Sequence, residues 1–486
     1  MSTFHKGLMS RDHEPSRRFL LKSGAAFAAG SAALTQLPRR AAAQDADAGL
    51  LRLQQQRRIL IRGGIVLTLD RAVGDFAAAD VLIEDGKIRE VRPDVAAADA
   101  AVIDAAGAIV IPGFVDTHSH SYEGLLRSSL PNGTLYDPTY EQDFANLTRA
   151  YQPPDVHAGV LVTALGMIAM GTTAVVDTSQ TSHTPEHSDA LIAAFKEAGI
   201  RAVVAYSPGA GAQAQYPQDV LRLQRTYFSS PDQLLTLALG VSRDPKLFTF
   251  ARENGLRAVM HLRLESDALV ALGRAGLLRE GDEYIHCAHL NEAAWRMIKD
   301  TGGRTSHSPP LEMAMGHGMP SIQDALDHGL KPSLSSDHTK TVAQDMFGMM
   351  RTAFELQRLA VLQKRMAGSQ NLPALVTPRE MLEFATIEGA RCAAIDRTAG
   401  TLTPGKDADV VILRADTLDV FPRSNAFGTV ASLMNPGHVE TVLIAGKVRK
   451  WRGSLIGVDL ARVRQLVQAS REAVMRRANF RVDVLG

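Results

Sequence analysis

A repeated alternation of short apolar runs and longer segments with helical spacing, over residues 114–395, constrains the fold of this chain more than any other feature. The short runs are rich in β-branched residues and several end in a polar or ionisable side chain, as in 173–177 and 201–206. The segments 154–170 and 345–366 have the length and spacing of helices. This alternation is typical of βα units around a parallel sheet. In such sheets, and above all in (β/α)8 barrels, reactive groups lie at the carboxyl ends of the strands.

The segments on both sides of this region have a different pattern, with short β-rich runs separated by turns. Residues 58–111 contain short β-rich runs, including a strand, an Asp85-Gly86 hairpin turn and a second strand. Similar runs around glycine turns return at 409–413 and 441–448. We therefore expect the two ends to build one small sheet together.

The first 43 residues resemble a twin-arginine signal peptide. Arg17 and Arg18 precede a mildly apolar, alanine- and glycine-rich stretch, 23–34, and the small residues 41–43 supply a cleavage site. An amphipathic or disordered N-terminal arm is the alternative. No later segment has the roughly 20 uninterrupted apolar residues that a membrane span requires. The expected location is therefore periplasmic or secreted, after export by the twin-arginine machinery.

The charge balance favours a small-molecule partner. Acids and bases nearly cancel, leaving a formal net charge of +1, and neither sign forms a long run. This pattern predicts no binding to nucleic acid, and no membrane binding once the signal is removed. Cys287 and Cys392 form no disulfide framework and no metal-binding pair in the sequence, so we expect both to be reduced and structural.

Four candidate metal ligands lie at predicted strand ends. His118 and His120 follow a Pro-Gly turn and a short strand, and alternate positions on a strand point to the same side. His261 ends a second strand, and Asp337 ends a third. Imidazole and carboxylate ligands suit a borderline divalent ion such as zinc, with a coordination position left for water.

These motifs, in their order, resemble the amidohydrolase superfamily, in its branch of cytosine deaminases, aminohydrolases and triazine hydrolases. The likeness runs from about Arg58 to Lys450. The segments that carry it are 112–120, 285–290, 305–309 with 315–320, 336–337, 385–391 and 400–410. The resemblance implies one divalent ion, zinc with iron as the alternative, bound by His118, His120, His261 and Asp337. It also implies that Asp337 takes a proton from the activated water, that His286 lies beside that water or polarises the substrate, and that the protein forms homo-oligomers.

The expected fold class is therefore α/β, a (β/α)8 TIM barrel with a small composite β-sandwich built from both ends of the mature chain. The predicted divisions are a signal peptide at 1–43, sandwich segments at 44–112 and 398–455, the barrel at 113–397 and a C-terminal helix at 456–486.

The chain departs from the family where a proton carrier is expected. Many deaminases of this branch have a glutamate three residues after the fifth-strand histidine, and here that residue is Leu264. Either the loop bulges and Glu265 carries the proton, or the shuttle is missing and Arg263 or His286 has taken part of its role. A further histidine common after the fourth strand is also missing from 239–243, which makes purine substrates less favoured.

The predicted function is metal-dependent hydrolysis of a C–N bond, by deamination or amide or amidine hydrolysis, in a small cyclic or aryl substrate. Displacement of another leaving group, such as halide, is an alternative, because an activated water can attack an electron-poor ring whatever departs. A catalytically silent metal-binding scaffold is a third reading. It is disfavoured because a scaffold has no chemical need for four ligands at strand ends.

Overall fold

The computed structural model describes residues 49–51, 53–230, 233–482 and 485, and the chain divides into two units, 1–55 and 56–486. In the first unit, residues 49–51 and 53–55 are helical. The predicted signal peptide, 1–43, lies outside the described residues. No helix among the described residues is long and apolar enough to cross a membrane.

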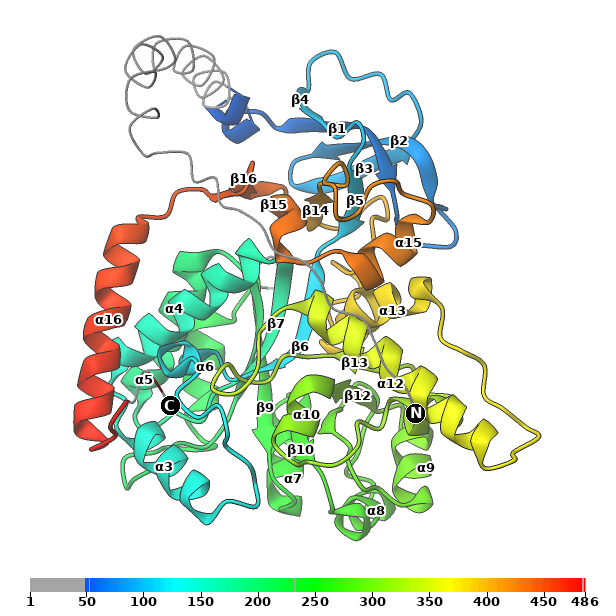
Figure 1. Cartoon of the computed structure of the whole chain (residues 1–486). Helices are drawn as coiled ribbons and strands as arrows, with labels where there is room; N and C mark the ends of the chain where they lie inside the picture. Colours follow the sequence, from blue (N-terminus) through cyan, green and yellow to red (C-terminus); the bar gives the residue numbers. More distant parts are fainter. Residues whose placement is uncertain (1–48, 52, 231–232, 483–484, 486) are drawn as a thin grey trace, which may run out of the picture. The chain divides into compact units, whose positions relative to one another are not determined.

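The second unit is built around a parallel barrel sheet (Figure 1). In the described part of the chain its strands are β6 (Phe114–Ser119), β7 (Thr172–Thr178), β8 (Arg201–Tyr206), β9 (Leu235–Val241), β10 (Ala258–Leu262), β11 (Glu283–His286), β12 (Arg304–His307) and β13 (Ser333–Leu334). They pair in sequence order, each parallel to the next. The sheet closes beyond β13, where the Asp337 N–H donates to the His118 carbonyl at 2.8 Å and the His120 N–H donates to the Asp337 carbonyl at 2.9 Å. The predicted barrel is confirmed.

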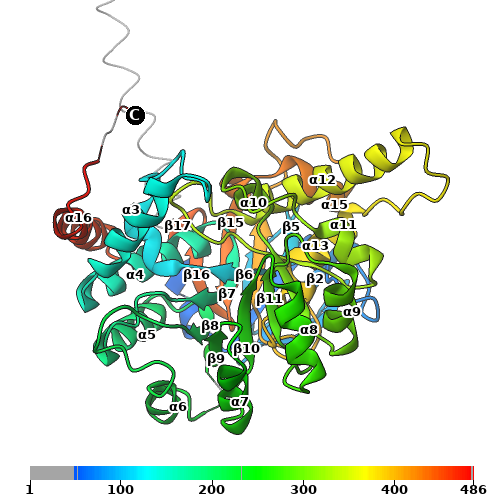
Figure 2. The same ribbon diagram turned by 90° about the horizontal axis from the view of Figure 1, so that it is seen from below.

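Helices surround the barrel on its outer side (Figure 2). The helices from the barrel region are α3 (Pro138–Arg149), α4 (Pro153–Ala169), α5 (Pro185–Ala198), α6 (Val220–Tyr227), α7 (Pro245–Glu253), α8 (Ser266–Arg274), α9 (Glu292–Asp300), α10 (Pro309–Ala314), α11 (Ile322–Asp327), α12 (Met346–Met366), α13 (Pro378–Ala385) and α14 (Ile387–Cys392), with the short 3-10 helix η1 (Ser121–Leu126). The final helix α16 (Leu460–Arg477) lies along α4. Its Arg477 donates to the Ala150 carbonyl at 2.7 Å and pairs with Asp155.

The barrel interior is filled by small and β-branched side chains, so it is a packed core and not a pore. Inward-facing residues alternate along each strand, as Ala174 and Val176 do on β7. Larger apolar side chains fill the layer between strands and helices, for example Phe195 and Phe248. This rigid interior leaves the polar strand ends as the place where chemistry can occur.

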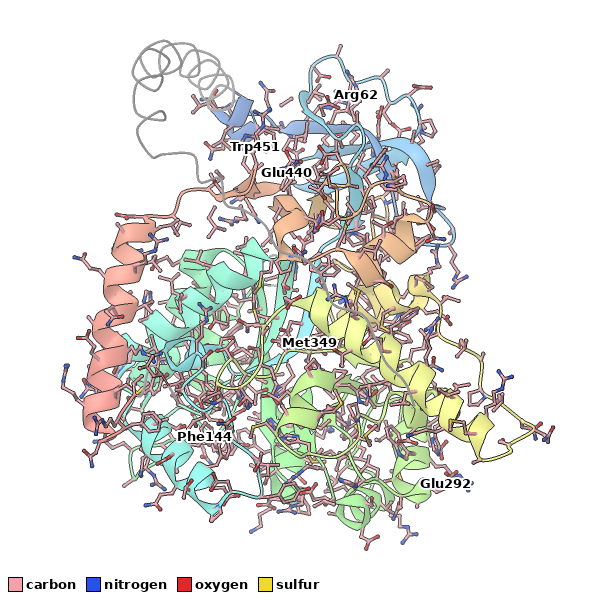
Figure 3. The ribbon with its side chains drawn as sticks, in the orientation of Figure 1. Arg62, Phe144, Glu292, Met349, Glu440 and Trp451 are labelled. Carbon is pink, nitrogen blue, oxygen red and sulfur yellow. The ribbon has the colours of Figure 1, made fainter. Side chains whose placement is uncertain are left out.

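Both ends of the second unit form one mixed sheet, as predicted. Among the described residues its strands are β1 (Arg58–Val66), β2 (Phe76–Glu84), β3 (Lys87–Arg92), β4 (Ala101–Asp104), β5 (Ile109–Pro112), β14 (Val410–Leu413), β15 (Val439–Ile444), β16 (Lys447–Trp451) and β17 (Ser454–Leu455). The early and late strands join where β5 pairs antiparallel with β14. Short helical segments lie between β14 and β15, namely α15 (Ala426–Gly428), η2 (Thr429–Leu433) and η3 (Pro436–His438). Figure 3 labels Arg62, Glu440 and Trp451 in this sandwich, apart from the barrel residues Phe144 and Met349.

An ion-pair cluster, buried at Arg201 and Asp409 and reaching the surface at Lys87, joins the barrel to the sandwich. Arg201, at the start of β8, donates to both carboxylate oxygens of Asp409, at 3.0 and 3.2 Å, and to Asp407 at 2.8 Å. Lys87 donates to Asp407 at 2.7 Å. Burial works to raise the pKa of Asp407, but the hydrogen bond from Lys87 and the charge of Arg201 outweigh it and hold that pKa below its usual value.

This cluster makes the fold sensitive to acid. Because the folded pKa of Asp407 lies below its unfolded value of about 3.9, its ion pairs stabilise the protein above that pH, and the stabilisation is lost as the pH falls through the folded pKa. We expect Asp407→Asn to lower the free energy of unfolding at pH 7, with a difference from wild type that shrinks below about pH 4. Urea unfolding across pH 3 to 7 measures this. The same substitution at the exposed Asp94 is the control; a pH-independent difference for Asp407→Asn would contradict the assignment.

Candidate metal centre

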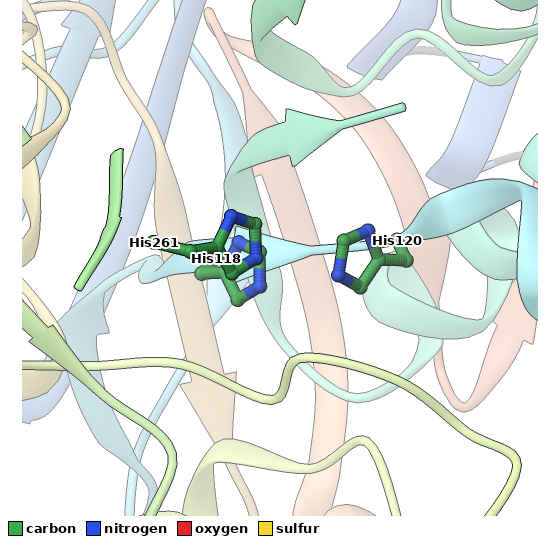
Figure 4. Close-up of side chains that lie close together, drawn as sticks. All are labelled: His118, His120 and His261. Atoms are coloured by element: carbon green, nitrogen blue, oxygen red, sulfur yellow. The ribbon is translucent and has the colours of Figure 1, made fainter. Parts of the chain in front are cut away.

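Three histidines converge at the carboxyl ends of the strands. His118 lies on β6, His120 directly follows that strand, and His261 lies on β10; one nitrogen of each lies within 4.8 Å of the others (Figure 4). The ring centroids of His118 and His261 are 4.7 Å apart, and those of His120 and His261 are 5.5 Å apart. His118 and His120 are buried, whereas His261 is exposed. The structure thus brings together the three predicted imidazole ligands.

Asp337 completes this cluster from the seam of the barrel. Its Oδ1 lies 3.4 Å from Nε2 of both His118 and His120. Among the described residues, neither Asp337 Oδ1 nor His118 Nε2 forms a hydrogen bond, although both are buried. Buried polar atoms are normally partnered, so two unpaired atoms that face one point fit a bound cation. The backbone of Asp337 has a φ of 59°, a left-handed conformation that an L-residue adopts rarely and that is common at functional sites.

The surrounding polar groups orient the imidazole rings. The Thr178 hydroxyl, on β7, is hydrogen-bonded to His118 Nδ1 at 3.2 Å. The Thr178 carbonyl lies 2.6 Å from His120 Nδ1. Both rings therefore turn Nε2 toward Asp337. In metal sites, a hydrogen bond to the second ring nitrogen orients a ligating histidine in this way. Burial and the neighbouring His118 lower the pKa of His120 to about 3, so the ring is neutral at pH 7 and offers a lone pair.

His286 lies on the other side of Asp337. Its Nε2 is 3.5 Å from Asp337 Oδ2, and its Nδ1 is 3.1 Å from Glu312 Oε1. The His317 ring packs edge-on against it, with centroids 4.4 Å apart. Burial lowers the pKa of His286 to about 4 and raises that of Glu312 to about 7. The sequence predicted that His286 lies near the metal but did not indicate Glu312. The one sign of Glu312 in the sequence is a carboxylate within an otherwise apolar stretch.

Glu265 lies beside His261 and is held by two hydrogen bonds. It lies just before α8, where its Oε1 accepts a hydrogen bond from Arg243 at 3.1 Å and its Oε2 accepts one from the Arg263 backbone N–H at 2.7 Å. It lines a small pocket beside His261, while Leu264 is 65% exposed. Glu265 is not among the groups whose ligand atoms cluster at the metal centre, and its role as proton carrier stays a prediction.

A cavity of about 380 Å³ opens over the ligands and is the natural place for a small substrate. Beside His120 and His261 it is lined by the aromatic residues Tyr140 and Phe144 and by a buried ion pair that the sequence did not predict. In that pair the Lys340 ammonium donates to Glu123 at 2.5 Å and lies 4.0 Å from the centre of the Phe144 ring.

The model of the amidohydrolase family matches residues 109–449, which include the whole barrel and every predicted ligand. The chain belongs to the amidohydrolase family.

Among the relatives of this amidohydrolase is the 5-methylthioadenosine/S-adenosylhomocysteine deaminase of Caldicellulosiruptor saccharolyticus. The two are 24% identical over 82% of this chain and 95% of the relative. The 5'-deoxyadenosine deaminase of Methanosarcina mazei is 25% identical over 87% of this chain and 99% of that protein. These relatives confirm a hydrolase of the deaminase branch, acting on C–N bonds other than peptide bonds.

Solved structures confirm the fold. An adenosine deaminase from Xanthomonas campestris with bound zinc superposes with a TM-score of 0.75 at 22% identity, over 86% of this chain and 98% of the other. The atrazine chlorohydrolase of Arthrobacter aurescens complexed with zinc gives 0.74 at 23% identity, over 85% and 100%. The amidohydrolase therefore has the same barrel as two zinc-containing proteins.

Proposed function

We propose that this amidohydrolase binds one divalent ion, zinc with iron as the alternative, through His118, His120, His261 and Asp337, and removes an amine or ammonia from a small cyclic or aryl substrate. The observation that carries the proposal is the pair of buried, unpartnered atoms, His118 Nε2 and Asp337 Oδ1, that face one another within the histidine cluster. Imidazole nitrogen with carboxylate oxygen is a donor set that suits zinc.

The position of each side chain determines its role in the proposed reaction. A divalent ion bound here supplies Lewis acidity, which makes water a usable nucleophile near neutral pH. Asp337 is the carboxylate placed to accept the proton that the nucleophile loses, because its two oxygens lie between the ligand histidines and His286. His286 faces the same point through Nε2, where it can hydrogen-bond the oxygen or leaving nitrogen of a bound substrate.

Purine nucleosides are disfavoured as substrates, even though the relatives are named for adenosine derivatives. Leu264 stands where the family's proton-carrying glutamate is expected, and Glu265 is held by Arg243 and a backbone amide. A substrate whose leaving group needs no ring-nitrogen protonation, such as an aryl amide or an amine on an electron-poor ring, suits this arrangement better.

Metal analysis of the purified protein, coupled to a screen of cyclic amides for ring opening and of pyrimidines, purines and triazines for ammonia release, tests the proposal. About one equivalent of zinc or iron with ammonia release supports it. Release of an alkylamine instead of ammonia also supports it, whereas metal with release of halide redirects the reaction to that leaving group. A protein that binds no divalent metal contradicts the whole assignment.

Export is a separate proposal. The paired arginines, apolar stretch and small-residue cleavage site support the twin-arginine route, and that route carries folded proteins. We expect Arg17→Lys with Arg18→Lys to leave the full-length protein in the cytoplasm of a bacterial host, whereas Arg39→Lys with Arg40→Lys, beyond the apolar stretch, leaves export intact. Fractionation and immunoblotting measure the result. Export of the first double variant at the wild-type level would contradict the proposal.

A further inference from the structure

A buried glutamate behind His286 has no part in the function proposed so far. Glu312 is 1% exposed and belongs to α10, the short helix that follows β12. Its Oε1 accepts a hydrogen bond from the Ser308 backbone N–H at 2.8 Å and lies 3.1 Å from His286 Nδ1. Its Oε2 has no hydrogen-bond partner among the described residues.

The shared oxygen decides which His286 nitrogen carries the proton. A backbone N–H can only donate, so Oε1 faces Ser308 as an acceptor. The same oxygen then accepts a proton from His286 Nδ1, which leaves Nε2 with its lone pair toward Asp337, 3.5 Å away. The His317 ring packs against the face of His286 and limits its rotation.

We propose that Glu312 is the positioning residue of His286, fixing its Nδ1–H tautomer and ring orientation so that Nε2 faces the substrate site. The inference rests on the proposed function, because His286 has no task without a substrate beside Asp337. The arrangement follows the general logic of a catalytic imidazole oriented by a carboxylate on its second nitrogen.

Glu312 also receives the Ser308 N–H at the start of α10, so a purely structural role in the loop has to be separated from a role at His286. Two substitutions do this. Glu312→Gln keeps a carbonyl oxygen, which the Ser308 N–H holds toward His286, removes the charge and places an NH2 group where Oε2 has no partner among the described residues. Glu312→Leu removes the acceptor. A matched control is Glu380→Leu at the start of α13, where Glu380 accepts the Thr377 N–H at 2.9 Å away from the metal centre.

The first readout needs no substrate. In zinc-loaded protein labelled with 15N-histidine, the ring signals of His286 are assigned by their loss in His286→Asn. We expect a single Nδ1–H tautomer in wild type, in Glu312→Gln and in Glu380→Leu, and a mixed or reversed tautomer in Glu312→Leu. Should Glu312→Leu fail to fold, Glu312→Asp, which withdraws the carboxylate from His286, serves in its place.

The second readout is kinetic, on whichever substrate of the ammonia-release screen is turned over. Loss of an orienting partner in a metal site typically costs about 10- to 100-fold in activity. We expect that loss in the kcat of Glu312→Leu, with KM and zinc content near wild type, and substantial recovery in Glu312→Gln. An unchanged tautomer with unchanged kcat in Glu312→Leu overturns the proposal, as does an equal loss in Glu380→Leu. If wild type binds zinc but releases nothing, the proposed function fails, and the tautomer measurement still decides the role of Glu312.

Discussion

Replacing His118 with alanine is expected to abolish metal binding and to lower kcat/KM by at least about 10³-fold, equivalent to about 4 kcal/mol of transition-state stabilisation. His118 is the ligand that belongs to both histidine clusters, with His120 and His261 on one side and with His286 and Asp337 on the other. Without its Nε2, the remaining groups no longer enclose one point. Plasma mass spectrometry for metal and initial rates with the identified substrate measure the two effects.

Asp337→Asn separates binding from proton uptake, because asparagine has nearly the same shape but cannot accept a proton as a carboxylate does. We expect it to retain part of the metal and to lose activity nearly as far as His118→Ala. His157→Ala, on the outer helix α4 where His157 pairs with Glu197 at 3.1 Å, is the matched control and should keep both properties. Wild-type metal content and activity in both site variants would rule out this centre.

Breaking the Glu123–Lys340 pair should destabilise the protein by about 3–5 kcal/mol, because removal of one partner leaves an unpaired charge in the core. Both side chains are 1% exposed, and burial raises the pKa of Glu123 and lowers that of Lys340 against their mutual attraction. We expect Lys340→Met to show this loss in urea unfolding of the metal-free protein, with EDTA present so that metal binding does not contribute.

The double variant Glu123→Leu with Lys340→Met should recover most of the stability, because it removes both charges and leaves apolar groups of similar size. Lys364→Met is the control. Lys364 pairs with Asp327 at 2.8 Å on the surface, where such pairs contribute about 0–1 kcal/mol. A double variant as unstable as Lys340→Met would show that the lost packing, and not the unpaired carboxylate, causes the effect.

Much of the fold was predictable because the pattern of apolar residues reports burial directly. Polar residues marked the strand ends, so β8 agrees with the predicted 201–206, and β10 continues one residue beyond His261, which was expected to end it. Helix α16, Leu460–Arg477, lies within the predicted 456–486, and Arg477 bonds it to the Ala150 carbonyl before α4. The sequence also indicated that the outer β-runs share a sheet, which the pairing of β5 with β14 confirms.

The site was predictable only where the ligands follow strand geometry. His118 and His120 share a face because side chains alternate along a strand, and His261 and Asp337 follow the last apolar residues of their runs. The contact of Glu312 with His286 depends on how the loop after β12 folds, which no periodicity records. Glu123 and Lys340 lie 217 residues apart in the chain, so their pairing is a product of barrel closure. Cys287 and Cys392, which we expect to be reduced, are both free and buried.

The pairing of β5 with β14 sets an order of events during synthesis. Val410 lies opposite Pro112 although the two residues are about 300 positions apart, and closing so long a loop is entropically costly and slow. While the chain is still on the ribosome, β5 lacks this partner and presents one edge unpaired, a state that exposes apolar surface and favours aggregation. Folding of the mixed sheet therefore cannot finish until the last 80 or so residues, which contain β14, have been synthesised. A chain truncated before β14 should remain prone to aggregation even though its barrel strands and its metal ligands are all present.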